Sequence, residues 1–122
     1  LLAAFGCALA YLLAGKALTA VLPQVPEEAA RMWAFVHRCA AAPIVEELVF
    51  RGIIQQLARP LGERQAVALQ AVLFAVQHRG PAGMAYALVC GLVLGTIRSR
   101  TGSVWPGMLL HTLNNLLVFA AG

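Results

Sequence analysis

The chain consists of long apolar runs separated by short breaks of proline, glycine and arginine. The runs cover residues 1–22, 27–58, 65–78, 82–97 and 103–121. Their lengths and the Pro and Gly residues at their ends favour helices over strands. The third run is shorter than the roughly 20 residues that cross a bilayer, so we expect it to end inside the bundle. The pattern predicts an all-α fold, a polytopic membrane helical bundle of about five helices.

The composition indicates a membrane protein with a single domain. Hydrophobic residues make up 61% of the chain and charged residues 11%, whereas about a quarter of the residues in a soluble domain are charged. A chain of 122 residues has room for one domain, which we expect to cover residues 1–122. The chain opens on Leu1 with no basic region before the first run, so we expect a core domain truncated at its N-terminus rather than a signal peptide.

The net charge of +4 comes from basic residues that stand singly or in pairs between the apolar runs, without interleaved aromatic residues. This pattern is typical of loops beside a lipid bilayer, so we expect no nucleic-acid partner. If the helices alternate in direction, a group of arginines shares one side of the membrane, which the positive-inside rule makes cytoplasmic. These residues are Arg59, Arg64, Arg98 and Arg100.

Charged residues interrupt the second apolar run at Glu46, Glu47 and Arg51. Residues four apart share a helix face, so Glu47 is expected to pair with Arg51. The carboxylate of Glu46 then has no predicted partner. Charged side chains inside a hydrophobic segment are costly and usually face a bundle interior or a wet cavity. Glu46 is therefore the first candidate for a functional residue, whereas a structural ion pair is the favoured interpretation of the other two.

Further polar residues lie within apolar runs. His78 ends the third run, and His111 and Asn115 are one helical turn apart in the fifth. Counted from the arginine-rich side at about 1.5 Å per residue, Glu46, His78 and His111 lie roughly 18, 20 and 12 Å deep. We therefore expect the helices to bring these side chains to one polar site inside the membrane. A carboxylate, two imidazoles and a carboxamide can activate water and hold the oxyanion of amide hydrolysis.

Short motifs stand in separate runs and in a fixed order: Glu46-Glu47-x-x-x-Arg51, Phe74-x-x-x-His78 and His111-x-x-x-Asn115. In this order they resemble the motifs of the CPBP family, the CAAX prenyl protease and bacteriocin-processing intramembrane proteases, also called the Abi family. The resemblance covers residues 40–120 approximately. It implies an intramembrane endopeptidase that acts on a prenylated protein or peptide, or on a bacteriocin leader. It also implies an integral protein of a prokaryotic plasma membrane, with its site open toward the cytoplasm.

The resemblance also implies roles for the residues of the motifs. Glu46 and His78 would activate the attacking water, and His111 with Asn115 would stabilise the tetrahedral oxyanion. The other charged residues of the first motif would support them. Whether zinc takes part stays open, because the chain lacks HExxH and the possible ligands Glu46, His78 and His111 come one per run. Two histidines and a glutamate would still be an acceptable ligand set for a catalytic zinc.

Each of these signals also has a plainer interpretation. His78, beside Arg79, could be an interfacial residue at a helix end, and His111 with Asn115 could join helices by hydrogen bonds. At the level of function, the alternatives are a bacteriocin-immunity or membrane scaffold protein of the same fold without catalysis, and a transporter or proton-conducting bundle. An enzyme would lose its activity when Glu46 becomes Gln, whereas a scaffold would tolerate the change.

Overall fold

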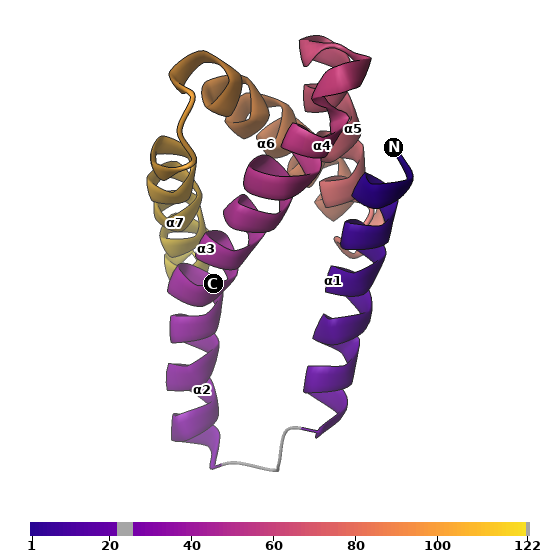
Figure 1. Cartoon of the computed structure of the whole chain (residues 1–122). Helices are drawn as coiled ribbons and strands as arrows, with labels where there is room; N and C mark the ends of the chain where they lie inside the picture. Colours follow the sequence, from indigo (N-terminus) through magenta and orange to yellow (C-terminus); the bar gives the residue numbers. More distant parts are fainter. Residues whose placement is uncertain (22–25, 122) are drawn as a thin grey trace.

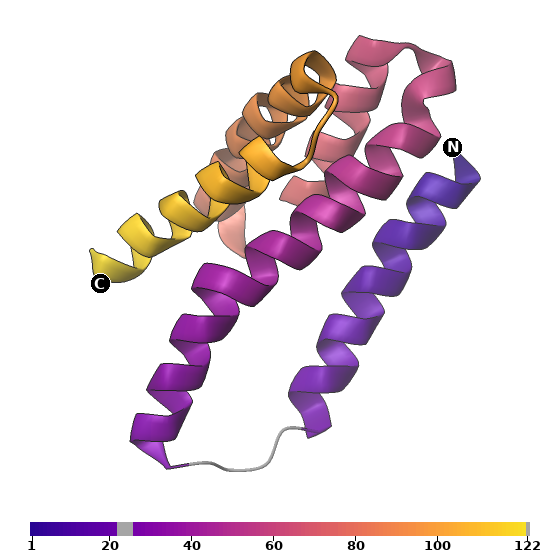
Figure 2. The ribbon, with the colours of Figure 1, turned by 60° about the vertical axis from the view of Figure 1, so that its left-hand side comes forward.

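The structure is a computed structural model that describes residues 1–21 and 26–121. Within these ranges all regular structure is helical, which confirms the predicted all-α bundle. A long helical rod of residues 27–58 lies between the first and the last helix, with two more helices behind it (Figures 1 and 2). The helices around the rod are α1 (Leu2–Val21), α5 (Glu63–Ala75), α6 (Gly80–Thr101) and α7 (Trp105–Ala120).

The rod departs from a uniform α-helix in two places. It is built from α2 (Glu27–Val36), the π-helical segment η1 (His37–Ala41), α3 (Ala42–Glu47), the π-helical segment η2 (Leu48–Ile54) and α4 (Gln55–Ala58). Pro43, in the first turn of α3, has no N–H to donate to the preceding turn, which favours a departure from α geometry there. π-helical turns often occur at functional sites, and Glu46 and Glu47 lie directly before the longer one.

The ends of α5 and α6 differ from the predicted boundaries. α5 ends at Ala75, so His78 lies in the turn after the helix and not within it. α6 starts earlier than predicted because Pro81 fits the first turn of a helix, where its missing N–H is not needed. It ends at Gly102, whose φ of +70° is a left-handed conformation that glycine adopts without strain. The break predicted near residue 23 lies outside the described residues.

The turn after the rod and the last turn of α6, both of which bear arginines, lie at the same end of the bundle, as Figure 1 shows. In the first of these turns, the 3₁₀ segment η3 (Arg59–Leu61) follows α4, and Arg59 Nε lies 3.3 Å from Glu63 Oε2. Arg98 Nη2 at the end of α6 donates to Gln56 Oε1 of the rod over 3.4 Å. Successive helices from the rod onward therefore alternate in direction, as the assignment of the arginines to one side assumed.

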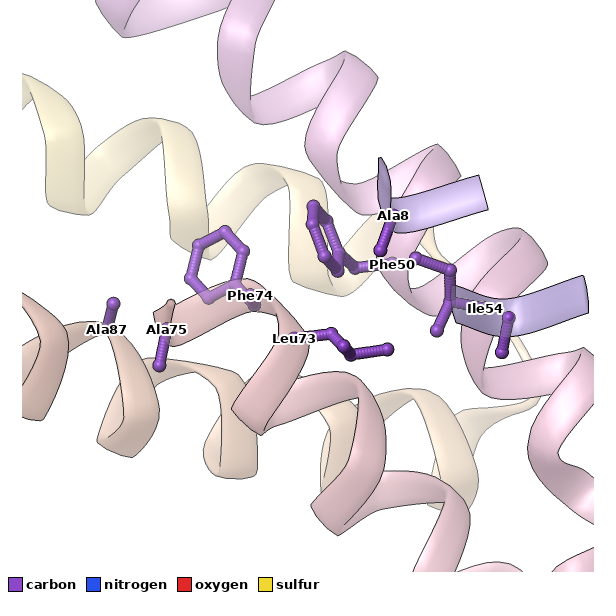
Figure 3. Packing of buried hydrophobic residues seen from close by; sticks show 8 residues of the cluster. Ala8, Phe50, Ile54, Leu73, Phe74, Ala75 and Ala87 are labelled. Atoms are coloured by element: carbon purple, nitrogen blue, oxygen red, sulfur yellow. The ribbon is translucent and has the colours of Figure 1, made fainter. Parts of the chain in front are cut away.

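A small aromatic core holds α1, the rod and α5 together. Phe50 and Phe74 are almost completely buried, and their ring centroids are 5.1 Å apart (Figure 3). Ala8 of α1 and Ile54 of the rod pack beside these rings. Most other large apolar side chains are exposed on the outer faces of the helices, where a bilayer would cover them. Among the described helices, α6 is the one long and apolar enough by itself to cross a membrane.

Close packing of α5 on α6 depends on two glycines. A Cβ at position 91 would lie 2.9 Å from the backbone Cα of Ala71, and a Cβ at position 95 would collide with the Gln70 amide. Gln70 Nε2 donates to the carbonyl oxygen of Gly91 over 2.7 Å. Gly91 and Gly95 thus form a small-residue contact of the kind that lets membrane helices approach closely. The contact holds α5, and with it Phe74, in place beside the rod.

Candidate active site

Glu46 and Glu47 are neighbours in the rod but lie in different surroundings. Successive residues of a helix project about 100° apart, so the two side chains leave the rod in different directions. The side chain of Glu47 is completely buried, whereas 19% of the Glu46 side chain remains exposed. The structure therefore places the Glu47 carboxylate in the packed interior and leaves the Glu46 side chain partly accessible to solvent.

The Glu47 carboxylate contacts partners from two helices. Its Oε1 lies 2.9 Å from Arg51 Nη1 in the rod and 3.0 Å from His111 Nδ1 in α7. The N–H groups of the buried Arg51 are not aligned for a hydrogen bond with any described residue, so charge attraction holds this pair. The Arg51 guanidinium also lies 4.6 Å from the centre of the Phe74 ring, a cation–π contact. The structure contains the pair expected from the sequence and adds His111 to it.

Gly107 allows α7 to approach the Glu47 carboxylate. A Cβ atom at position 107 would lie 2.6 Å from Glu47 Oε2, closer than real Cβ atoms come to an oxygen. His111 lies one helical turn later on the same face of α7 and is buried. The close approach of the helix at Gly107 is therefore what brings the His111 ring within hydrogen-bond distance of Glu47.

Glu46 is held between α1 and α7. The Tyr11 hydroxyl of α1 donates to Glu46 Oε1 over 3.1 Å, and His111 Nε2 lies 3.6 Å from Glu46 Oε2. The two ring nitrogens of His111 thus face the two adjacent carboxylates. When Nδ1 donates to Glu47, Nε2 is left facing Glu46, because the partner of one ring nitrogen sets the state of the other. The structure brings together Glu46 and His111, two of the residues predicted for one site.

His78 lies at the periphery of this arrangement. Its side chain is exposed, and its Nδ1 lies 3.1 Å from the carbonyl oxygen of Phe74. The Phe74 ring packs against both imidazoles, with centroid distances of 4.8 Å to His78 and 5.8 Å to His111. In the described part of the chain, no hydrogen bond or ion pair joins His78 to Glu46 or to His111. The Phe74 ring therefore packs against both of the histidines that the sequence placed at comparable depth.

Asn115 lies one turn after His111, but its carboxamide is turned toward the rod. Its Nδ2 donates to the carbonyl oxygen of Arg38 over 2.8 Å, and its Oδ1 accepts from Asn114 Nδ2 over 3.3 Å. Asn114 Oδ1 in turn accepts a hydrogen bond from the Tyr86 hydroxyl of α6. A carboxamide nitrogen carries two N–H bonds, so Asn115 retains one donor beyond the bond to Arg38.

A cavity of about 250 Å³ lies among α5, α6 and α7 beside these residues. His78, His111 and Asn115 line it, so three of the four predicted catalytic residues share one space. Glu46 is not among the lining residues. It faces His111, which does line the cavity. Most of the remaining lining is apolar and comes from α6 and α7: Ala87, Val89, Val93, Leu94 and Leu110.

The residues proposed as zinc ligands do not form a three-ligand set. Among residues 1–21 and 26–121, no three His, Cys, Asp or Glu side chains are placed to hold a metal ion. Glu46 faces His111, whereas the His78 ring packs on Phe74 and no hydrogen bond or ion pair in the described residues joins it to the other two. A catalytic zinc needs three protein ligands around one point, and these residues do not supply them.

The fold and the site define a class of protein: an α-helical membrane bundle with a buried carboxylate–imidazole site beside an apolar cavity. A family model described as type II CAAX prenyl endopeptidase, Rce1-like, matches residues 27–117. The chain belongs to this Rce1-like family of membrane-embedded proteases, which confirms the resemblance carried by the three motifs. The matched range contains the rod and every predicted site residue. No curated protein and no solved structure matches the chain.

Proposed function

We propose that the chain is an intramembrane endopeptidase that hydrolyses a peptide bond of a prenylated protein or peptide, with Glu46 as the general base. The observation that carries the proposal is the placement of the Glu46 carboxylate 3.6 Å from the His111 imidazole, inside the family-matched range. A carboxylate and an imidazole at this distance, shielded from bulk water, can move a proton from water to a leaving amine.

The proposed reaction begins with a water molecule within hydrogen-bond distance of both Glu46 Oε2 and His111 Nε2. Glu46 takes a proton from this water while its oxygen attacks the peptide carbonyl carbon, and the carbonyl oxygen becomes an oxyanion. The remaining N–H of Asn115 donates a hydrogen bond to the oxyanion, and His111 donates a second one from Nε2 when both of its ring nitrogens carry protons. When the intermediate collapses, the C–N bond breaks and Glu46 returns the proton to the amine nitrogen. His78 would assist the activation of water from the cavity side.

In this proposal Glu47 orients the imidazole. A carboxylate that accepts a hydrogen bond from one histidine nitrogen fixes the ring and the tautomer. Removal of such a partner from a metal-binding histidine lowers activity by roughly 10- to 100-fold, and we expect a loss of similar size here. Glu47 is suited to this task because it is buried and held by Arg51. We therefore assign to Glu47 a positioning role in addition to its ion pair.

The cavity suggests where the hydrocarbon part of a substrate would bind. Its volume of about 250 Å³ lies near the lower end of ligand pockets, which begin at roughly 300 Å³. It is therefore large enough for part of a prenyl chain next to the scissile bond, but not for a whole lipopeptide. The exposed side chains of Val89 and Val93 lie at its rim, where the rest of the chain could continue into the bilayer.

The proposed orientation follows from the charge distribution. The turns bearing Arg59 and Arg98 lie at one end of the bundle, and the positive-inside rule makes that end cytoplasmic. We propose that this end faces the cytoplasm and that the protein resides in the plasma membrane of a prokaryote.

The test is cleavage of a peptide that ends in a prenylated cysteine and three further residues, in liposomes that contain the protein. Glu46→Gln keeps the size of the side chain and removes the base, so we expect cleavage to stop while the thermal unfolding temperature stays near that of the wild type. Glu28→Gln, the same change at an exposed position in α2, is the control and should leave the rate unchanged. Full activity of Glu46→Gln would refute the mechanism, and no cleavage by the wild type would favour a scaffold or immunity role.

A further inference from the structure

We propose that Tyr11 of α1 is a positioning residue of the active site, which holds the Glu46 carboxylate facing His111. The inference rests on the proposed role of Glu46. It extends the site to a helix outside the range that the family model matches, which begins at residue 27. Sequence reasoning missed this role, because Tyr11, like Phe5, is an aromatic residue in an apolar run without a motif.

The two oxygens of the Glu46 carboxylate are each approached from a different helix. Oε1 accepts the Tyr11 hydroxyl over 3.1 Å, and Oε2 lies 3.6 Å from His111 Nε2. A glutamate side chain rotates about several bonds and Glu46 is partly exposed, so a single contact at 3.6 Å would leave it many orientations. A hydrogen bond to an ionised carboxylate is among the stronger ones in proteins. The Tyr11 hydroxyl therefore selects the orientation in which Oε2 faces the imidazole.

The Tyr11 ring is itself fixed by the aromatic core. It packs edge-on against Phe50, with centroids 5.7 Å apart and ring planes at 84°. Phe50 contacts Phe74, and Phe74 contacts His111. One chain of packed rings thus sets the positions of both groups that approach Glu46. Figure 3 shows the central part of this chain, with Ala8 of α1 beside Phe50.

The packing of α1 supports the same assignment. Ala4 and Ala8 are buried and recur with helical spacing before Tyr11, so they share its face. Small side chains at these positions bring α1 close to the rod, near enough for the Tyr11 hydroxyl to reach Glu46. The cavity is lined by residues of α5, α6, α7 and the turn after α5, and Tyr11 is not one of them. Because its hydroxyl donates to Glu46, Tyr11 is expected to act on the carboxylate.

The first test is Tyr11→Phe, which removes the hydroxyl and keeps the ring against Phe50. We expect kcat to fall roughly 10- to 100-fold, as for other residues that orient a catalytic group, and KM to stay the same. Cys7→Ala, one turn earlier in α1 and also packed near the core, is the control for a disturbance of α1. It should leave both constants unchanged. An unchanged kcat of Tyr11→Phe, or a change in KM alone, would overturn the proposal.

A double-mutant cycle separates positioning from a general effect on the bundle. Glu46→Asp shortens the side chain and withdraws the carboxylate from the Tyr11 hydroxyl. If Tyr11 acts through Glu46, adding Tyr11→Phe to this variant should change kcat less than twofold. A loss as large as in the wild-type background would show that the hydroxyl acts elsewhere, and it would overturn the proposal.

Thermal unfolding distinguishes this proposal from the proposed function, because it needs no peptidase activity. The wild type, Tyr11→Phe, Glu46→Ala and the double variant are compared in the same detergent. If the hydrogen bond exists, the unfolding temperature of the double variant should lie above the value expected from adding the two single shifts. Additive shifts would overturn the assignment of Tyr11 even if the wild type cleaves its substrate. A wild type without cleavage but with non-additive shifts would refute only the proposed function.

Discussion

Uncharged replacements of Glu47 and Arg51 separate the folding role of this pair from its role in catalysis. Both side chains are completely buried, with Glu47 Oε1 2.9 Å from Arg51 Nη1. The same oxygen lies 3.0 Å from His111 Nδ1. One carboxylate therefore neutralises a buried cation and also orients an imidazole. A variant that removes only the need to neutralise Arg51 will show what the orientation of His111 contributes to activity.

The effect on stability follows from the burial of the pair. Glu47→Met leaves the Arg51 charge buried without its counter-ion, which should lower the free energy of unfolding by about 3–5 kcal/mol. Glu47→Met combined with Arg51→Met removes both charges. Uncharged replacements of a buried ion pair are often neutral, or stabilising by about 1–4 kcal/mol. We therefore expect the double variant to be about as stable as the wild type and clearly more stable than Glu47→Met alone.

The effect on activity is isolated by a second double variant, Glu47→Gln combined with Arg51→Met. Its amide carbonyl oxygen can still accept the hydrogen bond of His111 Nδ1, whereas a methionine thioether is only a weak acceptor. The two double variants differ only at position 47. We expect kcat to be roughly 10- to 100-fold below the wild type with Met at this position, and closer to the wild type with Gln.

The assays are thermal unfolding in detergent and cleavage of the prenylated peptide in liposomes. Equal activity of the two double variants would refute the reasoning, because it would show that an acceptor for His111 Nδ1 is not required. Glu47→Met with the stability of the wild type would refute the first step, since Arg51 would then not be a buried charge in need of a counter-ion.

Three further predictions concern the surroundings of the site. Gly107→Ala places a Cβ against Glu47, so we expect a loss of about 1–3 kcal/mol in unfolding free energy and a lower cleavage rate. Gly6→Ala, whose Cβ would lie in open space, is the control and should leave the cleavage rate unchanged. Phe74→Ala should lower the unfolding free energy by about 3–5 kcal/mol, and stability within 1 kcal/mol of the wild type would contradict its place in the core. Protein depleted of metal by chelation should keep its cleavage rate, because no three His, Cys, Asp or Glu side chains converge within residues 1–21 and 26–121. Recovery only on adding zinc would contradict this.

The helices could be predicted from the sequence because the apolar runs and their breaks carry enough information. The bounds of the rod, residues 27–58, agree with the prediction, since Pro and Gly follow directly in Pro60 and Gly62. The end of α5 could not be predicted to the residue, because Val76 is as apolar as the helical residues before it. His78 consequently lies in a turn, where its exposure agrees with the interfacial interpretation.

The site itself could be predicted only in part. Helical spacing predicted the pair of Glu47 with Arg51, and the comparable depths of Glu46 and His111 predicted that these two side chains meet. Tyr11 was missed because its partner lies 35 residues away in sequence and no local spacing marks the contact. The direction of the Asn115 carboxamide was also hidden, since helical spacing fixes the face of a side chain but not the torsion at its end.

The order of the two adjacent glutamates explains why they have different roles. Their side chains diverge by about 100° around the rod, so a single partner atom could not contact both. The two nitrogens of His111 can, because they lie on different edges of one ring and Gly107 lets α7 come close. Glu47 is completely buried and contributes to the stability of the fold, whereas the partly exposed Glu46 stays accessible to water and to a peptide. A change at Glu46 should therefore stop the reaction with the fold intact, and a change at Glu47 should affect both.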